Sequence, residues 1–385
     1  MHTDTRSNEN STFRQFLVAN DIDPLIYDTV SPIPRYVRVK PGSELSADDV
    51  IADLGSSKAI PVPWLPNFLQ IDGECGIASS VLYRDGKIYG IDASSGAAVM
   101  ALNCTSGDRV LDLCCAPGAK LCMIADLIGQ DGVVDGVDIS LHRLTSCRTM
   151  LSRYKTSNAR LFLADGTKFS PPVVNKVQGN TAVQNRWLRL DASAMSIYFT
   201  TESGLLPKLQ SKKKKKYFAK QISLQDRIGG PFEEQTPSDI DTAIERSGLP
   251  YDSVLVDAEC THDASLKHLA KHEKCGFDWD AHFGPERQAQ LEILQRQLIL
   301  NGFHLVKSGG ILVYSTCSYT RRQNEDIVQW LLRNETTAEL VDIDVPSFAY
   351  CPAVPGLLPR TLRFSPAASR TGGLFIAKLR KNEQF

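Results

Sequence analysis

The stretch VLDLCCAPGAK, residues 110–120, joins a short apolar run to a turn of small residues that contains Pro117 and Gly118. Residues 121–128 follow with apolar side chains at helical spacing, and Gly129 closes them. An apolar run, a Pro-Gly turn and a periodic segment predict a strand, a tight turn and a helix in that order. This order is the repeating unit of a parallel sheet.

The same pattern recurs downstream. Residues 132–138 and 160–165 read as strands on either side of an Arg-rich helix over 141–154. Further strands are predicted at 253–257, 310–315, 340–344 and 374–379, with a helix from about 285 to 306 and a Pro-rich surface excursion over 345–373. The sequence therefore predicts an α/β fold, a Rossmann-like sheet with helices on both faces.

Two segments do not follow this pattern. Residues 1–75 are mixed and Pro-rich, which predicts a small N-terminal α+β extension before a main domain over 76–385. Residues 170–249 are an insertion, because a crossover between parallel strands needs far fewer residues. Its centre, Lys212–Lys216, is a run of five lysines that we interpret as a solvated, partly disordered loop. A nuclear-import signal or an RNA-phosphate contact is the alternative.

Composition limits the class of protein. The 385 residues carry 43 basic and 44 acidic side chains, so nucleic-acid binding has to come from a local basic face. Ten cysteines scattered through a sequence in which no secretory signal is read indicate reduced thiols, and no apolar run reaches the roughly 20 residues of a membrane span. We expect an intracellular monomer with no membrane segment, in the nucleus or cytoplasm, with the mitochondrion left open.

The cofactor is predicted from the strand ends. The first four strands end in acids, and the turn after the first lacks both GxGxxG and GxxxxGK[ST], which argues against NAD and ATP. An acid after the second strand suits a ribose diol, one after the third suits an adenine edge, and a turn of small residues lets the backbone approach a sulfonium group. The pattern indicates S-adenosylmethionine. The acids are Asp112, Asp138, Asp165 and Asp257.

Two cysteines follow adjacent strand ends, Cys260 after the fourth strand and Cys317 after the fifth. A cysteine in a polar crevice beside a carboxyl can act as a thiolate nucleophile. The alternative for each is a small buried packing residue. The pair at one crevice favours nucleophilic catalysis on an electrophilic ring.

Four stretches in order resemble the NOL1/NOP2/Sun family of RNA cytosine-5 methyltransferases: GIDASSGAAVMAL (90–102), VLDLCCAPGAK (110–120), VLVDAEC (254–260) and ILVYSTCSYTRRQNED (311–326). A closing GGLFIAKLRK (372–381) resembles the family's last strand, so the likeness spans about residues 76–385. The resemblance implies a class I methyltransferase sheet.

The resemblance also implies roles for residues. Cys317 would add to C6 of cytosine, Asp257 would hydrogen-bond near N3, and Cys260 would assist loss of the C5 proton and release of the product. Lys120 would order the catalytic site. The cofactor contacts it implies are Cys115, Ala116, Pro117, Gly118, Lys120, Asp138, Arg143, Asp165 and Asp257. The expected substrate is RNA, tRNA before rRNA; the alternative is a SAM-binding ribosome-assembly factor with little or no activity.

The chain departs from the family at Glu259, where proline is usual, and at Ala119 and Leu121 in the cofactor turn. The Glu259 carboxylate would either raise the pKa of Asp257 or point into solvent.

Basic residues alternate with apolar ones in a segment near the N-terminus. This spacing predicts a half-buried strand with a basic exposed face formed by Arg35, Arg38 and Lys40, and the resemblance to the family implies that this face contacts RNA. The alternative is an edge strand protected by charge.

A further cluster combines His262, His268 and His272 with Cys275. Zinc uses such ligands, but interleaved lysines and the absence of a cysteine pair favour a basic helix that contacts RNA phosphate, and no metal site is predicted.

Overall fold

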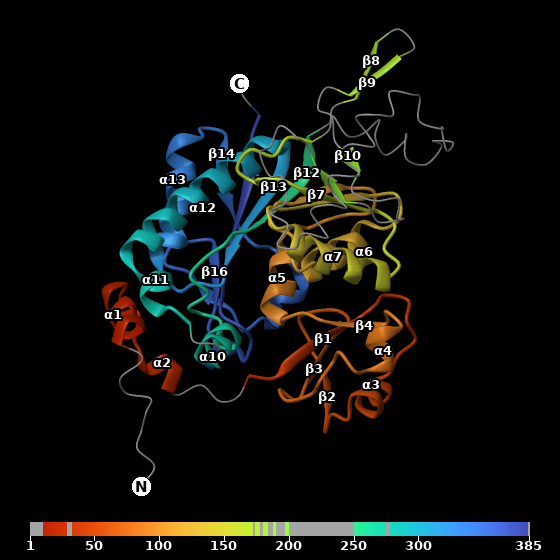
Figure 1. Ribbon diagram of the computed structural model, residues 1–385, viewed down its shortest axis with the longest axis vertical. Coiled ribbons are helices and arrows are strands. Elements are labelled where there is room, and N and C mark those ends of the chain that lie inside the picture. Colours follow the sequence, from red (N-terminus) through yellow and green to blue (C-terminus); the bar gives the residue numbers. More distant parts are fainter. Residues whose placement is uncertain are drawn as a thin grey trace, which may run out of the picture.

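The computed structural model describes residues 11–28, 33–171, 174–177, 180–183, 188–189, 197–199, 250–274 and 277–383. A large sheet carries the fold (Figure 1). From one edge to the other its strands are β10 (Leu188–Arg189), β11 (Ile197–Phe199), β7 (Ala159–Leu163), β6 (Val133–Asp138), β5 (Arg109–Asp112), β12 (Tyr251–Asp257), β13 (Val306–Thr316), β17 (Leu374–Lys381), β16 (Thr361–Phe364) and β15 (Val354–Pro355), and β14 (Ala338–Val341) pairs with β17.

The direction of these strands creates the crevice. Strands β11, β7, β6, β5, β12 and β13 run parallel to one another, and β10 and β17 at the two ends of this set are antiparallel to it. The chain builds outward from β5 through β6 to β7 and then returns to the other side of β5 with β12. Because strand order reverses between β5 and β12, the carboxyl ends of these two strands flank the position where such sheets bind ligands.

Helices cover both faces of the sheet, as predicted. α5 (Ala93–Ala101), α6 (Ala119–Ile128) and α7 (Leu141–Arg153) lie on one face, and α12 (Pro285–Leu305) and α13 (Glu325–Asn334) on the other. Successive side chains of β12 point to opposite faces of the sheet, and both faces are apolar. Val254 and Val256 pack into the core beneath α12, whereas Leu255 packs into the core beneath α5 and α6. The apolar runs of the sequence are strands buried on both sides.

Two predicted segments differ from the structure. The strand expected at 340–344 is β14 and ends at Val341. The segment 345–373 is not only a surface excursion, because β16 lies within it and pairs with β17. Phe364 of β16 is buried and stacks on Trp64, with ring centroids 5.8 Å apart. The remaining elements there are β15, the 3-10 turn Pro346–Tyr350 and α14 (Pro366–Ser369).

The N-terminal part forms a second, small sheet. It has the order β2 (Ala59–Pro61), β3 (Phe68–Ile71), β1 (Arg35–Val39) and β4 (Ile88–Gly90), all antiparallel, with α3 (Ala47–Leu54) and α4 (Val81–Arg84) beside it. Ser46 and Asp49 form a capping box that begins α3. The sheet continues past residue 75, since its last strand reaches Gly90.

The first helices pack elsewhere. α1 (Ser11–Ala19) lies beside α11 (Trp279–Phe283) on the far side of the large sheet from α7 (Figure 1). The rings of Phe13 and Phe16 each lie 4.8 Å from that of Phe283. Tyr27 of α2 (Leu25–Asp28) donates a hydrogen bond of 2.9 Å to the carbonyl of Asp263. Residues before β1 therefore brace the loop that follows β12.

Part of the insertion lies outside the described residues, including the lysine run 212–216. The hairpin β8 (Val174–Val177) and β9 (Asn180–Val183) is described, and β10 and β11 extend the large sheet beyond β7. Within the described residues, no helix combines the length and the apolar character that crossing a membrane requires.

The prediction that Arg38 lies on an exposed basic face is wrong. Its residue is only 2% exposed, and its guanidinium pairs with Asp126 of α6 and donates a hydrogen bond of 2.8 Å to the Tyr89 hydroxyl. The alternation of basic and apolar residues correctly predicts a strand, but the face of β1 that carries Arg38 packs against α6 instead of facing solvent. Arg38 therefore joins the small sheet to the large one.

Replacing Arg38 by methionine is expected to lower the free energy of unfolding by about 3 kcal/mol, because it leaves Asp126 beside an apolar wall without its cation. Urea unfolding followed by circular dichroism measures the change. A variant with unchanged stability and weakened RNA binding would show that Arg38 contacts RNA instead.

Candidate functional site

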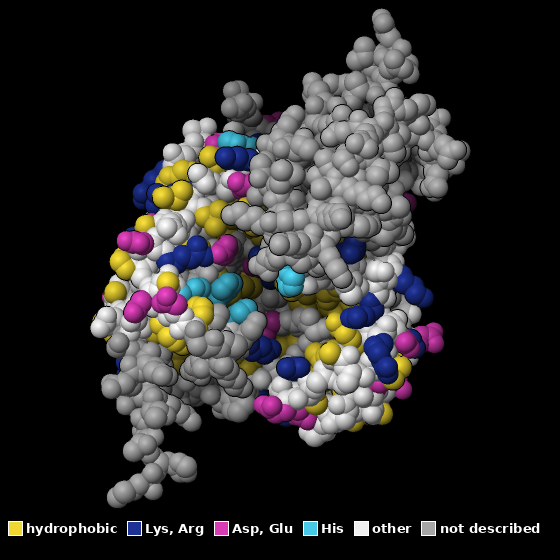
Figure 2. Space-filling view, in the orientation of Figure 1, with side chains coloured by type: hydrophobic (Ala, Val, Ile, Leu, Met, Phe, Trp, Pro, Cys, Tyr) yellow, Lys and Arg dark blue, Asp and Glu magenta, His cyan; other side chains and the backbone are white. Residues whose placement is uncertain are grey.

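A cavity of about 790 Å³ opens at the carboxyl ends of β5, β6, β7 and β12 and extends to the small sheet. In the space-filling view a hollow lies between the two parts of the molecule, with histidine side chains beside it and basic side chains gathered over the small sheet (Figure 2). The cavity brings together most of the residues that the sequence singled out. Those that line it are Arg35, Ala116, Pro117, Lys120, Asp138, Arg143, Asp165, Asp257 and Cys317.

The remaining predicted site residues do not line the cavity. Cys115, Gly118 and Cys260 lie behind its wall, and Lys40 donates a hydrogen bond to the carbonyl of Tyr154. Arg35 is half-buried and donates a hydrogen bond of 2.7 Å to the carbonyl of Cys75. Arg35 is thus the member of the predicted basic face that reaches the cavity.

The turn after β5 is held tightly against α7. Cys115 donates a backbone hydrogen bond of 2.9 Å to the carbonyl of Val137. Gly118 has a φ of +108°, and a Cβ there would lie 3.2 Å from the Cα of Cys147. Only glycine combines this backbone conformation with this close approach. The turn therefore brings the backbone of residues 116 and 117 to the cavity with little side chain between.

Two carboxylates meet the cavity beyond the turn. Asp138 is nearly buried, accepts a hydrogen bond of 2.8 Å from the Ser140 N–H, and lies 3.3 Å from a guanidinium nitrogen of Arg143. Arg143 also donates to the carbonyl of Ala116, which fixes the turn to α7. Asp165 accepts hydrogen bonds from the N–H and hydroxyl of Thr167. Both carboxylates are positioned by their own loops before any ligand arrives.

Asp112 behaves differently from the other strand-end acids. It is 1% exposed, does not line the cavity, and within the described structure neither carboxylate oxygen makes a hydrogen bond of ordinary geometry. Burial, with the nearby charge of Asp257, raises its pKa to about 7. The acid at the end of β5 therefore lies inside the wall, whereas those after β6, β7 and β12 face the ligand position.

Lys120 and Asp257 form the charged centre of the cavity. The ammonium of Lys120, at the start of α6, lies 2.7 Å from one oxygen of Asp257, and the Ser315 hydroxyl donates to the other at 2.7 Å. Burial alone would lower the pKa of Lys120, but the carboxylate of Asp257 outweighs it and the pKa is raised. Lys120 therefore stays protonated, and it holds Asp257 in one orientation.

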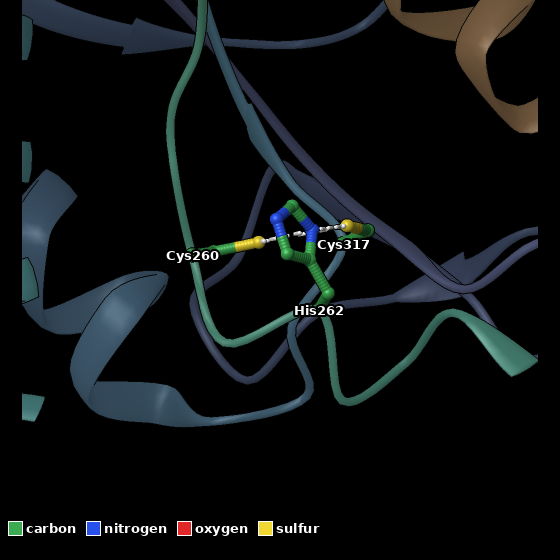
Figure 3. A group of neighbouring side chains, drawn as sticks. All are labelled: Cys260, His262 and Cys317. Atoms are coloured by element: carbon green, nitrogen blue, oxygen red, sulfur yellow. Dashed lines mark hydrogen bonds between the residues drawn. The ribbon is translucent and has the colours of Figure 1, made fainter. Parts of the chain in front are cut away.

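The two predicted cysteines lie side by side. The Sγ atoms of Cys260 and Cys317 are 3.5 Å apart, and Nδ1 of His262 lies 2.9 Å from Cys317 and 3.6 Å from Cys260 (Figure 3). Cys317 and His262 line the cavity, whereas Cys260 is 1% exposed behind them. The sequence analysis placed His262 with an RNA-contacting helix, but that helix, α10, begins at Leu266. The sequence feature that could have assigned His262 to the site is its position two residues after Cys260.

Buried side chains hold the loops that carry these cysteines. Gln295 of α12 donates to the carbonyl of Glu259, and Gln323 accepts from the N–H of Thr261. Asn324 accepts from the Thr316 hydroxyl at 2.5 Å and donates to the carbonyl of Ser318 at 2.8 Å. The segment after Cys317 thus closes back on the loop, with its 3-10 turn at Arg321–Gln323. Sequence reasoning did not identify Gln295 and Gln323.

Glu259 forms a salt bridge with Arg287 of α12. Its side chain is 46% exposed, and the salt bridge accounts for its charge. The carboxylate is thus paired with α12, and Glu259 also lines the cavity beside Asp257.

Cysteine and histidine are zinc ligands, and the ligand atoms of Cys260, His262 and Cys317 lie within 4.8 Å of one another. Two ligands of one tetrahedral zinc would place nitrogen and sulfur about 3.5 Å apart. The 2.9 Å between His262 and Cys317 is shorter and suits a shared proton. We therefore describe the cluster as hydrogen-bonded.

The residues at the cavity fit a nucleoside cofactor. Its volume lies in the range of roughly 300–1,000 Å³ typical of ligand pockets. The strand-end carboxylates Asp138 and Asp165 suit hydroxyl and amino groups, and no phosphate-binding turn is present in the described loop after β5. The donor set and shape define a class I methyltransferase cavity.

Comparison with known proteins places the chain within that class. The family described as 16S rRNA methyltransferase RsmB/F matches residues 99–192 and 234–380. The chain belongs to this family, within the NOL1/NOP2/Sun RNA methyltransferases, whose cofactor is S-adenosylmethionine.

The curated relatives are longer than this chain. Ribosomal RNA small subunit methyltransferase F of Cronobacter sakazakii is 24% identical over 371 residues, which cover 94% of this chain and 59% of the relative. The protein of the same name from Klebsiella pneumoniae is 25% identical over 368 residues, 93% of this chain and 60% of the relative. The chain thus spans about 60% of the length of these relatives.

Solved structures share the fold. A methyltransferase homolog protein from Pyrococcus horikoshii superposes with a TM-score of 0.58 at 23% identity, covering 95% of this chain and 98% of that one. NSun6 from Pyrococcus horikoshii with SFG gives a TM-score of 0.61 at 17% identity, covering 94% of each chain.

Proposed function

We propose that this protein transfers a methyl group from S-adenosylmethionine to C5 of a cytosine in RNA, through a covalent bond between Cys317 and C6. One observation carries the proposal: two cysteines lie 3.5 Å apart beside the Lys120–Asp257 pair of a class I methyltransferase cavity, and one of them, Cys317, lines that cavity. A structural role for either cysteine would not require this arrangement.

The chain would bind its ligands from different sides of the cavity. Asp138 would hold the ribose, Asp165 the adenine edge, and the backbone of residues 116 and 117 the rest of the cofactor, with Arg143 fixing their loop. When bound, the cofactor supplies an electrophilic methyl group. Arg35, on the small sheet, would meet an RNA phosphate beside the flipped base.

The reaction follows from the geometry of Cys317. Its thiolate would add to C6 of the cytosine, and the electron pair displaced from the C5–C6 double bond would make C5 nucleophilic. Asp257 would hydrogen-bond at the N3 edge, while the Lys120 charge stabilises the negative charge that develops on the ring. After methylation, the thiolate of Cys260 would take the C5 proton, the C5–H electron pair would re-form the C5–C6 double bond, and the sulfur of Cys317 would leave C6 as a thiolate.

The relatives bear on the choice of RNA. Both are named for small-subunit ribosomal RNA, so rRNA is the first substrate to test, ahead of the tRNA favoured on the sequence. The test incubates the protein with methyl-labelled S-adenosylmethionine and size-fractionated RNA, followed by nucleoside analysis. Label in 5-methylcytidine of one fraction is expected. Intact cofactor binding with no transfer to any fraction would contradict the proposal and favour a ribosome-assembly factor.

A further inference from the structure

We propose that His262 is the acid–base partner of the Cys260–Cys317 pair and keeps one of the two cysteines as a thiolate. This inference rests on the proposed function, because it assigns a proton acceptor to the proposed nucleophile. Nδ1 of His262 is 2.9 Å from the Sγ of Cys317 and 3.6 Å from that of Cys260 (Figure 3).

The backbone places His262 here by an unusual conformation. Its φ is +54°, in the left-handed region that side chains other than glycine seldom adopt. This turn directs the ring back between the ends of β12 and β13. The ring is further fixed by stacking on His268 of α10, with centroids 4.7 Å apart and an interplanar angle of 25°. Strained backbone conformations such as that of His262 are found preferentially at functional sites.

The proton transfer is balanced within the cluster. The proton on Cys317 moves to Nδ1 of His262, the S–H electron pair stays on sulfur, and the imidazole becomes an imidazolium. This step requires the neutral ring to carry its proton on Nε2. The resulting thiolate is the species that would add to C6.

The negative charge of the thiolate can lie on the sulfur of Cys260 or on that of Cys317. His262 is closer to Cys317, yet it is the pKa of Cys260 that lies well below its ordinary value: burial would raise it, but the hydrogen bond from the Cys317 thiol and the charge of His262 outweigh burial. The hydrogen bond with Cys260 and burial raise the pKa of Cys317. Because the sulfurs are 3.5 Å apart, one proton can pass between them, so a thiolate on Cys260 and a thiolate on Cys317 are two arrangements of the same number of protons.

The surroundings favour the charged ring. The Cys260 thiolate raises the pKa of His262 to about 9 despite burial, and Asp257 and Glu259 act in the same direction. His282 of α11, His268 of α10 and Lys120 of α6 oppose it when protonated. The other titratable groups near the cluster are Asp263 and Tyr314. Since the raised pKa lies above neutrality, the imidazolium and its thiolate persist through neutral pH. As pH rises through about 9 the ring loses its proton and the ion pair is lost, whereas the thiolate remains.

The test measures thiolate formation without RNA. Iodoacetamide labelling of the full chain is followed against pH by mass spectrometry, because tryptic cleavage after Arg246, Lys267, Lys307 and Arg321 puts the two cysteines in separate peptides. His262→Asn tolerates a positive φ but cannot hold the charge. Its labelling at pH 7 is expected to fall about 10-fold or more, with the inflection moving toward the ordinary thiol value near 9.

A matched control and an RNA assay separate the possible results. His304→Asn alters an exposed histidine of α12 that does not line the cavity and should label like the unaltered protein. A His262→Asn protein that folds normally and keeps the original pH profile would overturn the inference. If the unaltered protein labels at low pH but methylates no RNA, the ion pair stands and the proposed function fails.

Discussion

Cys317→Ala is expected to lower methyl transfer to RNA by about 10³-fold or more, the scale of loss when a covalent nucleophile is removed. Cys317 lines the cavity, whereas Cys260 is buried behind it, so Cys260 is not placed to attack in its stead. Binding of S-adenosylmethionine should be unchanged, because Cys317 lies at the end of β13, away from Asp138 and Asp165. Transfer of labelled methyl groups and calorimetric titration of the cofactor measure the two quantities.

Cys351→Ala is the matched control. Cys351 is partly buried and does not line the cavity, so its replacement should leave the rate of transfer within about twofold of the original. Retention of most of the activity by Cys317→Ala would remove this cysteine from the mechanism.

Asp135→Asn is expected to lower the free energy of unfolding by about 3–5 kcal/mol. Asp135 is fully buried on β6 and accepts hydrogen bonds of 2.6 and 2.7 Å from Arg160 and 2.7 Å from the Tyr251 hydroxyl. Arg109 lies 3.5 Å away. The amide keeps the shape of the carboxylate but leaves two buried guanidinium groups without their counter-charge.

The same site predicts a pH dependence. Burial would raise the pKa of Asp135, but Arg160 and Arg109 outweigh it and hold the pKa below its ordinary value of 3.8. A lowered folded-state pKa stabilises the fold above about pH 4, and this stabilisation is lost as pH falls through the folded-state value. The difference between the two proteins should therefore be constant from about pH 5 to 7 and shrink in stronger acid.

Urea unfolding at several pH values checks both expectations. Asp342→Asn serves as the control, because its pair with Arg360 is exposed to solvent and should contribute less than about 1 kcal/mol. An Asp135→Asn protein as stable as the control at neutral pH would contradict the role given to this carboxylate.

The large sheet could be predicted because its signals are local. Apolar runs of strand length alternate with helical spacing, and the run 110–113 ends in the turn that starts α6. The ends of the strands also predicted the cavity, since Asp138, Asp165 and Asp257 follow β6, β7 and β12 and line it together. The carboxyl ends of parallel strands lie at one edge of the sheet, so assigning the strands is enough to predict that these distant residues lie close together.

What could not be predicted depends on contacts between distant segments. Arg38 has the spacing of an exposed cation, and only the packing of β1 against α6 buries it beside Asp126. Asp112 has the same sequence context as the other strand-end acids, but it turns into the wall. His262 meets Cys317 only because its backbone turns back at a positive φ while β13 lies beside β12.

The covalent bond between Cys317 and the base is the central claim, and a trapped complex tests it most directly. Cys260→Ala lacks the group assigned to product release, so incubation with RNA and S-adenosylmethionine should accumulate a complex that resists denaturing electrophoresis. Nuclease and tryptic digestion should place a 5-methylcytidine adduct on the peptide 308–321, which contains Cys317. The double variant Cys260→Ala, Cys317→Ala should form none. An adduct on another residue, or full turnover by Cys260→Ala with no complex at any time, would contradict the account.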